Sequence, residues 1–172
     1  MEPLWSTRTE RALTNPGSWG HPEICRKPCL YFSQGLCNAG ASCGFCHMPH
    51  LHPNTGLDKR QRTWLQEMDQ RLVLAILWPH LHHHAVNLSQ FHYEYVSSII
   101  SLLHREVPEN VNHIIAEFDP EEATRLNRVL QRMTFSSLVS LVCKRYGPGS
   151  FTSQLNYELE KLRIKLKTKV NL

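Results

Sequence analysis

Long apolar runs and enzyme signatures are both missing from this chain of 172 residues. The longest apolar run, Leu72 to Trp78, has seven residues, whereas a membrane-spanning helix needs about 20. Residues 1–11, MEPLWSTRTER, lack the apolar segment of a secretory signal. The chain also lacks a glycine-rich phosphate loop, a nucleophile elbow and a pair of catalytic acids. We therefore expect no membrane span, no enzyme and no small-molecule substrate, and a location in the nucleus or cytoplasm.

Cysteine is scarce outside one short stretch. Five of the six cysteines lie between Cys25 and Cys46. The nucleus and cytoplasm keep thiols reduced, so such a cluster is better explained by metal ligation than by disulfides. The stretch from His21 to Pro53 also has too few large apolar residues to close a core, and domains this short generally need a metal or a cross-link. A structural metal is therefore predicted.

The ligand spacing is C-x7-C-x5-C-x3-H, formed by Cys29, Cys37, Cys43 and His47. Three thiolates and one imidazole suit tetrahedral zinc, and four ligands leave no open position for water or substrate. We predict a structural Zn²⁺ site. Cys46, adjacent to His47, can chemically replace that histidine.

Two further ligand questions stay open. Cys25 precedes Cys29 by four residues, so it can also stand in for a ligand. A ubiquitin-ligase ring domain, with its cross-braced zinc ligands, is not favoured. Such a domain needs eight ligands, and this cluster supplies at most seven even with His50. Outside the cluster, HLHHH places His80 and His84 on one helical face, where a polar surface is the simpler interpretation because no third ligand is evident.

The segment KPCLYFSQGLCNAGASCGFCHMPH resembles the CCCH zinc fingers in spacing, glycines and aromatics. The resemblance covers about residues 23–50 and implies a compact module with little regular secondary structure that most often binds single-stranded RNA. Phe32 and Phe45 fall where family members carry aromatics that stack on unpaired bases. Tyr31 can supplement them. Basic side chains that can contact phosphates are Arg26 and Lys27.

An alternative function follows from the rest of the pattern. Ala39 lies where RNA-binding members often carry an aromatic, and Phe32 and Phe45 can instead form the small core of the module. The protein is then an adaptor whose zinc module is purely structural and whose helical region docks a protein partner. The basic runs at 59–62 and 161–169 either add to an RNA surface or are solvated helix faces.

Beyond the turn PNTG at 53–56, apolar residues recur at helical spacing. One stripe runs over 57–77 and is expected to end at Pro79, and others cover 91–103 and 107–118. Asp119 followed by Pro120 is a strong helix start, and Gly147-Pro148-Gly149 a strong stop. The segment from Ser150 ends in LRIKLKTKV, which alternates like a strand, but we predict a helix because no other segment pairs with it.

These patterns predict a small zinc-stabilised module with little regular secondary structure, followed by an all-α domain of five to six helices. The expected boundaries are a flexible tail at 1–20, the zinc finger at 21–53 and the helical domain at 57–170. The net charge of +4 permits an anionic partner such as RNA without requiring one.

Overall fold

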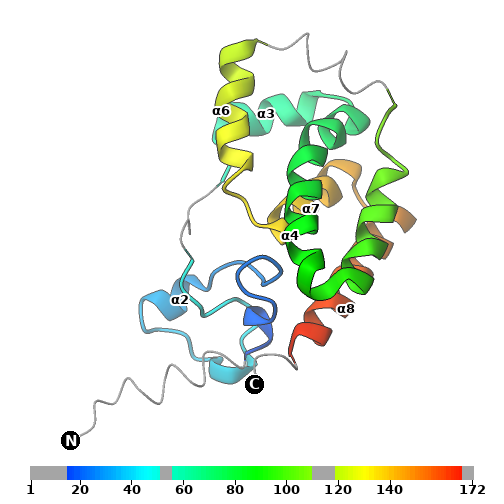
Figure 1. Cartoon of the computed structure of the whole chain (residues 1–172). Coiled ribbons are helices and arrows are strands. Elements are labelled where there is room, and N and C mark those ends of the chain that lie inside the picture. The colour runs from blue at the N-terminus through cyan, green and yellow to red at the C-terminus, as the bar shows by residue number, and fades with distance from the viewer. Residues whose placement is uncertain (1–14, 51–55, 110–118, 168–172) are drawn as a thin grey trace, which may run out of the picture. The chain divides into compact units, whose positions relative to one another are not determined.

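A computed structural model describes residues 15–50, 56–109 and 119–167, except for the side chains of 89–95 (Figure 1). Contacts divide the chain into two units. The first comprises Met1–Pro53 with Leu159–Leu172, and the second Asn54–Glu158. The end of the C-terminal helix thus groups with the cysteine-rich part of the chain. No helix in the described segments is both long and apolar enough to cross a bilayer.

The cysteine-rich part, residues 15–50, is called the Cys/His module below. Its regular structure is limited to η1 (Pro16–Ser18), α2 (Leu30–Ser33), η2 (Gly40–Ser42) and a parallel bridge between Pro28 and Cys46. The prediction of little regular secondary structure here is confirmed. Such short elements cannot hold a fold by themselves, because none is long enough to bury a continuous apolar face.

Residues 15–20, placed in a flexible tail by the sequence pattern, pack within the module. The buried side chain of Asn15 donates from Nδ2 to the carbonyls of Cys43 and Phe45, at 2.8 and 2.7 Å. The amide of Gly17 donates to the Cys43 carbonyl at 3.2 Å, and the hydroxyl of Ser18 accepts from the His47 amide at 3.0 Å. These bonds join segments about 30 residues apart, which explains why no local pattern reveals them.

The last turns of α8 (Ser150–Lys167) supply contacts that the module lacks on its own. Arg163 is buried and donates from Nε to the carbonyl of Ile24 at 2.8 Å. Arg26 forms an ion pair with Glu160, in which Nη2 donates to both carboxylate oxygens at 3.0 Å. The sequence pattern treats the basic run that contains Arg163 as one surface, but this guanidinium faces inward.

The second unit is helical throughout its described secondary structure. Its elements are α3 (Lys59–Glu67), α4 (Gln70–His104), α6 (Pro120–Leu130), α7 (Phe135–Tyr146) and the first part of α8. Five helices in the described residues beyond 56 confirm the prediction of an all-α domain. The helix starts follow capping rules: Asp58 and Gln61 form a capping box, and Asp119 accepts from the Glu122 amide. Gly147, with φ of 71°, ends α7 as predicted.

The one clear departure in this unit is Pro79, which lies inside α4 instead of ending a helix. Leu74, Leu77 and Leu81 are completely buried on both sides of it, and Pro79 itself is exposed. Burial of these side chains offsets the loss of one backbone hydrogen bond at proline. The break occurs earlier, between α3 and α4, where Asp69 caps the Arg71 amide. Of the other predicted stripes, 110–118 and the side chains of Phe91 and Tyr95 lie outside the description.

Candidate metal centre

The four residues that the spacing singles out lie together in the Cys/His module. One ligand atom each from Cys29, Cys37, Cys43 and His47 lies within 4.8 Å of all the others. Cys29 immediately precedes α2, Cys43 immediately follows η2, and His47 comes just after the bridge at Cys46. Short turns therefore converge on one point from three parts of the module.

The spacing of these atoms fits a tetrahedral zinc shell. Zinc–sulfur bonds of about 2.3 Å and zinc–nitrogen bonds of about 2.0 Å place two sulfurs about 3.8 Å apart, and a sulfur and a nitrogen about 3.5 Å apart. In the structure, the sulfurs of Cys29 and Cys43 are 3.9 Å apart. Cys37 Sγ and His47 Nε2 are 3.4 Å apart. Both distances thus match the edge lengths of such a tetrahedron.

Burial sets the chemistry of these groups. Cys29, Cys43 and His47 are buried, and Cys37 is half-buried. Burial lowers the pKa of His47, which favours the neutral imidazole that a metal requires. Burial raises the pKa of the Cys43 thiol, so a cation is needed there to stabilise the thiolate. All six cysteines belong to the described residues, and none forms a disulfide.

Backbone hydrogen bonds fix the ligand-bearing segments. The amide of Cys29 donates to the carbonyl of Cys46 at 2.8 Å, and the amide of Cys46 donates to that of Lys27 at 2.9 Å. The amide of Phe45 donates to Cys43 Sγ at 3.4 Å, a contact that favours a thiolate. The chain before Cys29 and the chain around Cys46 therefore run side by side.

Phe32, assigned by the resemblance to base stacking, stacks on the ligand His47. The two ring centroids are 3.9 Å apart and the ring planes differ by 9°. Phe32 is half-buried. One of its faces is therefore covered by the metal site, which favours the interpretation of Phe32 as part of the module's small core.

The other residues assigned to RNA contact are on the surface. Tyr31 is 66% exposed and Phe45 54% exposed. Lys27 and Arg26 are also exposed, the latter in its ion pair with Glu160. Two aliphatic side chains that the sequence pattern does not single out are even more exposed, Leu30 at 72% and Leu36 at 61%.

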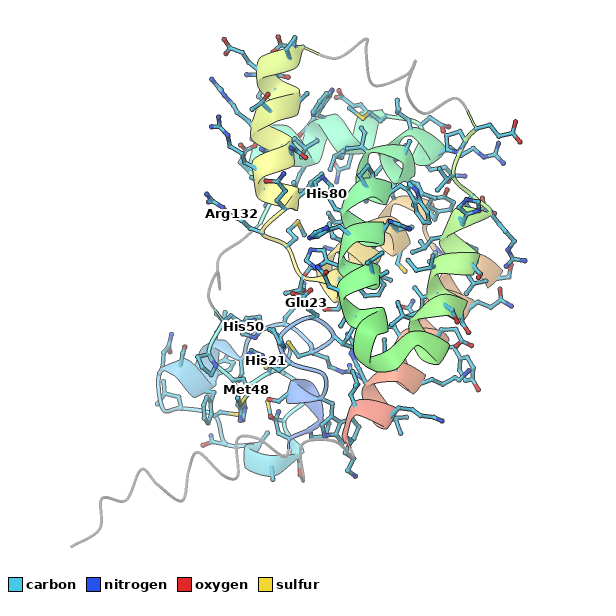
Figure 2. The ribbon with its side chains drawn as sticks, viewed as in Figure 1. His21, Glu23, Met48, His50, His80 and Arg132 are labelled. Carbon is cyan, nitrogen blue, oxygen red and sulfur yellow. The ribbon has the colours of Figure 1, made fainter. Side chains whose placement is uncertain are left out.

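The sequence leaves open whether Cys25 or Cys46 can replace one of these ligands. In the structure, neither cysteine is part of this shell. Both lie with His21 and His50, which Figure 2 shows close together. In an extended segment, successive side chains point to opposite sides, so Cys46 and His47 face different clusters. A hydrogen bond with Cys25 lowers the pKa of Cys46 to about 4. The same bond, together with burial, raises the pKa of Cys25.

His21 is the residue that the sequence pattern misses, and with it the ligand count reaches eight instead of seven. The available signal was its four-residue separation from Cys25, which matches that between Cys25 and Cys29. His80 and His84 lie on α4 and belong to neither group of candidate ligands found among the described residues.

Comparison with protein-family models, with curated proteins and with solved structures found no match to this chain. The geometry is therefore what carries the assignment. It shows a Cys/His site able to hold a metal such as zinc, in a module that precedes a helical domain.

Proposed function

We propose that the protein is a zinc-dependent regulatory protein that binds single-stranded RNA through a CCCH finger. Cys29, Cys37, Cys43 and His47 would hold the Zn²⁺. The four donors close its coordination shell, so the ion supplies shape and no catalysis. The observation that carries the RNA part of the proposal is the exposure of Tyr31 and Phe45 on the module that the metal holds in shape.

Exposed aromatic rings on a rigid support suit unpaired bases. Each stacked base contributes about 1–3 kcal/mol. Two bases give about 2–6 kcal/mol, whereas a micromolar Kd requires roughly 8 kcal/mol. Binding by Tyr31 and Phe45 alone is therefore weak, and phosphate contacts must add to it.

Lys27 and Arg26 are placed to supply such contacts. Both follow the buried Ile24–Cys25 segment and are exposed. The ion pair of Arg26 with Glu160 is solvent-accessible, and pairs of this kind contribute only about 0–1 kcal/mol, so a phosphate can compete for the guanidinium. Affinity should then fall steeply with salt, because each phosphate contact releases counterions.

The test is titration of the zinc-loaded full chain with short unstructured RNAs, read by fluorescence anisotropy at low salt. Phe45→Ala and Tyr31→Ala should each weaken binding roughly 5- to 150-fold, from about 1–3 kcal/mol per stacked base. Tyr157→Ala, which removes an equally exposed ring from the other unit, is the matched control and should leave binding unchanged. Absence of binding at low salt, or variants indistinguishable from wild type, would remove the proposal.

The second candidate is a protein-interaction adaptor in which the module is structural. It is favoured by the contact of Phe32, because the ring that the resemblance assigns to base stacking is stacked on the ligand His47 instead. Cross-linking in cells followed by mass spectrometry would identify a partner of the full chain. A partner retained by the Cys43→Ser chain supports docking through the helical region, and a partner lost on that substitution counts against it.

A further inference from the structure

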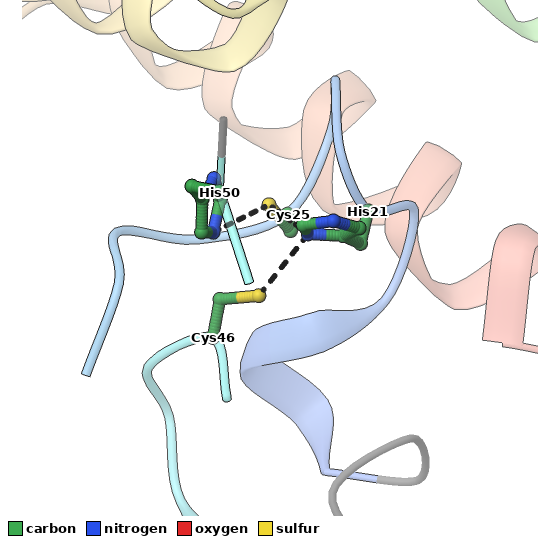
Figure 3. Close-up of side chains that lie close together, drawn as sticks. All are labelled: His21, Cys25, Cys46 and His50. Atoms are coloured by element: carbon green, nitrogen blue, oxygen red, sulfur yellow. Dashed lines mark hydrogen bonds between the residues drawn. The ribbon is translucent and has the colours of Figure 1, made fainter. Parts of the chain in front are cut away.

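A second group of four side chains lies outside Cys29, Cys37, Cys43 and His47, which are called the CCCH set below. His21, Cys25, Cys46 and His50 each offer one ligand atom, and these atoms lie within 4.8 Å of one another (Figure 3). Both cysteines are only 2% exposed, and both histidines are half-buried. Two thiols and two imidazoles whose ligand atoms converge in this way form a donor set that suits a metal ion such as zinc.

The geometry of this group matches a tetrahedral metal shell. His21 Nδ1 lies 3.6 Å from Cys25 Sγ and 3.5 Å from Cys46 Sγ. His50 Nε2 lies 3.8 Å from Cys25 Sγ. Sulfur and nitrogen bound to one zinc ion are about 3.5 Å apart. The two distances from His21 match as closely as the corresponding distance of 3.4 Å in the CCCH set, and the distance from His50 is slightly longer.

One hydrogen bond leads out of the group, from the Cys25 thiol to the Pro22 carbonyl at 3.2 Å, but hydrogen bonds describe the contacts within the group poorly. An imidazole nitrogen either carries one hydrogen or accepts one, yet the single Nδ1 of His21 stands between two sulfurs at nearly equal distances. The rings of His21 and His50 meet edge to face, with centroids 4.7 Å apart and planes at 79°. In this orientation each ring brings one nitrogen to a cysteine sulfur, His21 to both Cys25 and Cys46 and His50 to Cys25 (Figure 3).

The backbone builds the two groups together. The paired segments at Pro28 and Cys46 carry ligands of both groups, and the adjacent Cys46 and His47 belong to different ones. Along the chain, ligands of the second group come first and last and enclose those of the first. Neither group can therefore form fully without ordering the segments that the other one uses.

We propose that His21, Cys25, Cys46 and His50 bind a second Zn²⁺, so that the module holds two structural metal ions. Two thiolates and two imidazoles in a closed tetrahedron are a common structural zinc set. This second site shares no ligand with the CCCH set, and its proposal does not depend on whether the protein binds RNA. Two ions fix the chain at eight points between residues 21 and 50, in a module with few large apolar residues.

The first test is the metal content of the purified full chain, by native mass spectrometry together with elemental analysis. Wild type should carry two zinc ions. Cys25→Ser and His50→Gln should each lower the content to one, and the control Cys143→Ser, a cysteine outside both groups, should leave two. One ion in wild type that is lost on Cys43→Ser and kept on His50→Gln would overturn the second site while leaving the first. A chain lighter by two hydrogens, with Cys25 joined to Cys46, would also overturn it.

A second test needs no variant and so does not depend on how substitutions affect folding. Replacing zinc by Co²⁺ gives sulfur-to-metal charge-transfer absorption that scales with the number of thiolate ligands. Two sites predict five thiolates per chain, three from the CCCH set and two from the second group. Absorption corresponding to three thiolates, or a single equivalent of Co²⁺ at saturation, would contradict the proposal.

Discussion

The ring of Phe32 stacks on the ring of His47, with centroids 3.9 Å apart and planes inclined by 9°. A metal site gains from such a contact, because groups around a ligating histidine hold its ring in the orientation that binding needs. Phe32 thus supports the metal site, whereas Phe45 is exposed.

Phe32→Leu should therefore weaken zinc binding. An aromatic pair contributes about 0.5–1.5 kcal/mol beyond area burial, so we expect a roughly 2- to 10-fold loss in zinc affinity, measured by competition with a chromophoric chelator. Phe45→Leu, at an exposed ring, is the control and should keep wild-type affinity. Equal zinc affinities in the two variants would show that the stacked contact does nothing for the metal.

Gly17→Ala should destabilise the module. A Cβ at residue 17 would lie 2.2 Å from the backbone carbon and oxygen of Phe45, so the paired backbones must move apart. Overpacking of this kind costs typically about 1–3 kcal/mol. Gly44→Ala is the matched control, because nothing lies within 4 Å of a Cβ there. Thermal unfolding of the zinc-loaded chain should show a lower midpoint only for Gly17→Ala, and the same shift for both would contradict this packing.

Arg163→Lys should loosen the end of α8 from the module. Lysine has no Nε–H in the position that bonds the Ile24 carbonyl at 2.8 Å, and leaving a buried acceptor unpaired costs about 1–3 kcal/mol. Arg132→Lys, the same change at an exposed site, should be neutral. Hydrogen exchange of residues 20–26 should accelerate in Arg163→Lys alone. Unchanged protection would mean that this bond contributes little.

His80 should make the helical unit sensitive to acid. Burial, and next the charge of His84, lower the pKa of His80, so the folded chain holds it neutral while the unfolded chain takes up a proton near its usual pKa of about 6.5. The associated stability is present above that pH and is lost as pH falls below it. Denaturant unfolding from pH 7.5 to 5 should depend less on pH in His80→Gln than in wild type, with the exposed His83→Gln as control. Identical pH profiles for wild type and His80→Gln would refute this role.

Short-range sequence patterns predict the parts of the structure that depend on residues close together in the chain. The four CCCH ligands lie within nineteen residues, so their convergence needs only short turns. The start at Asp119-Pro120 and the stop at Gly147 follow from capping and from the conformational freedom of glycine.

Short-range sequence patterns cannot predict the features that depend on contacts between residues far apart in the chain. Asn15 is fixed by carbonyls about 30 residues away, and Arg163 by a carbonyl 139 residues away. Pro79 reads as a helix end, but burial of the leucines around it decides otherwise. His21 has a single spacing signal, its four-residue separation from Cys25, because its other partners Cys46 and His50 approach it only in the folded module.

The proposed metal ions would give the module its shape, and their removal tests this most directly. Amide spectra of the full, isotope-labelled chain should be recorded before and after zinc is stripped by a strong chelator. We expect the signals of residues 15–50 to collapse into the unfolded range, while those of α3, α4, α6 and α7 keep their dispersion, and re-addition of zinc to restore the first set. Dispersed, unshifted signals from residues 15–50 in a chain shown to be metal-free would contradict the account.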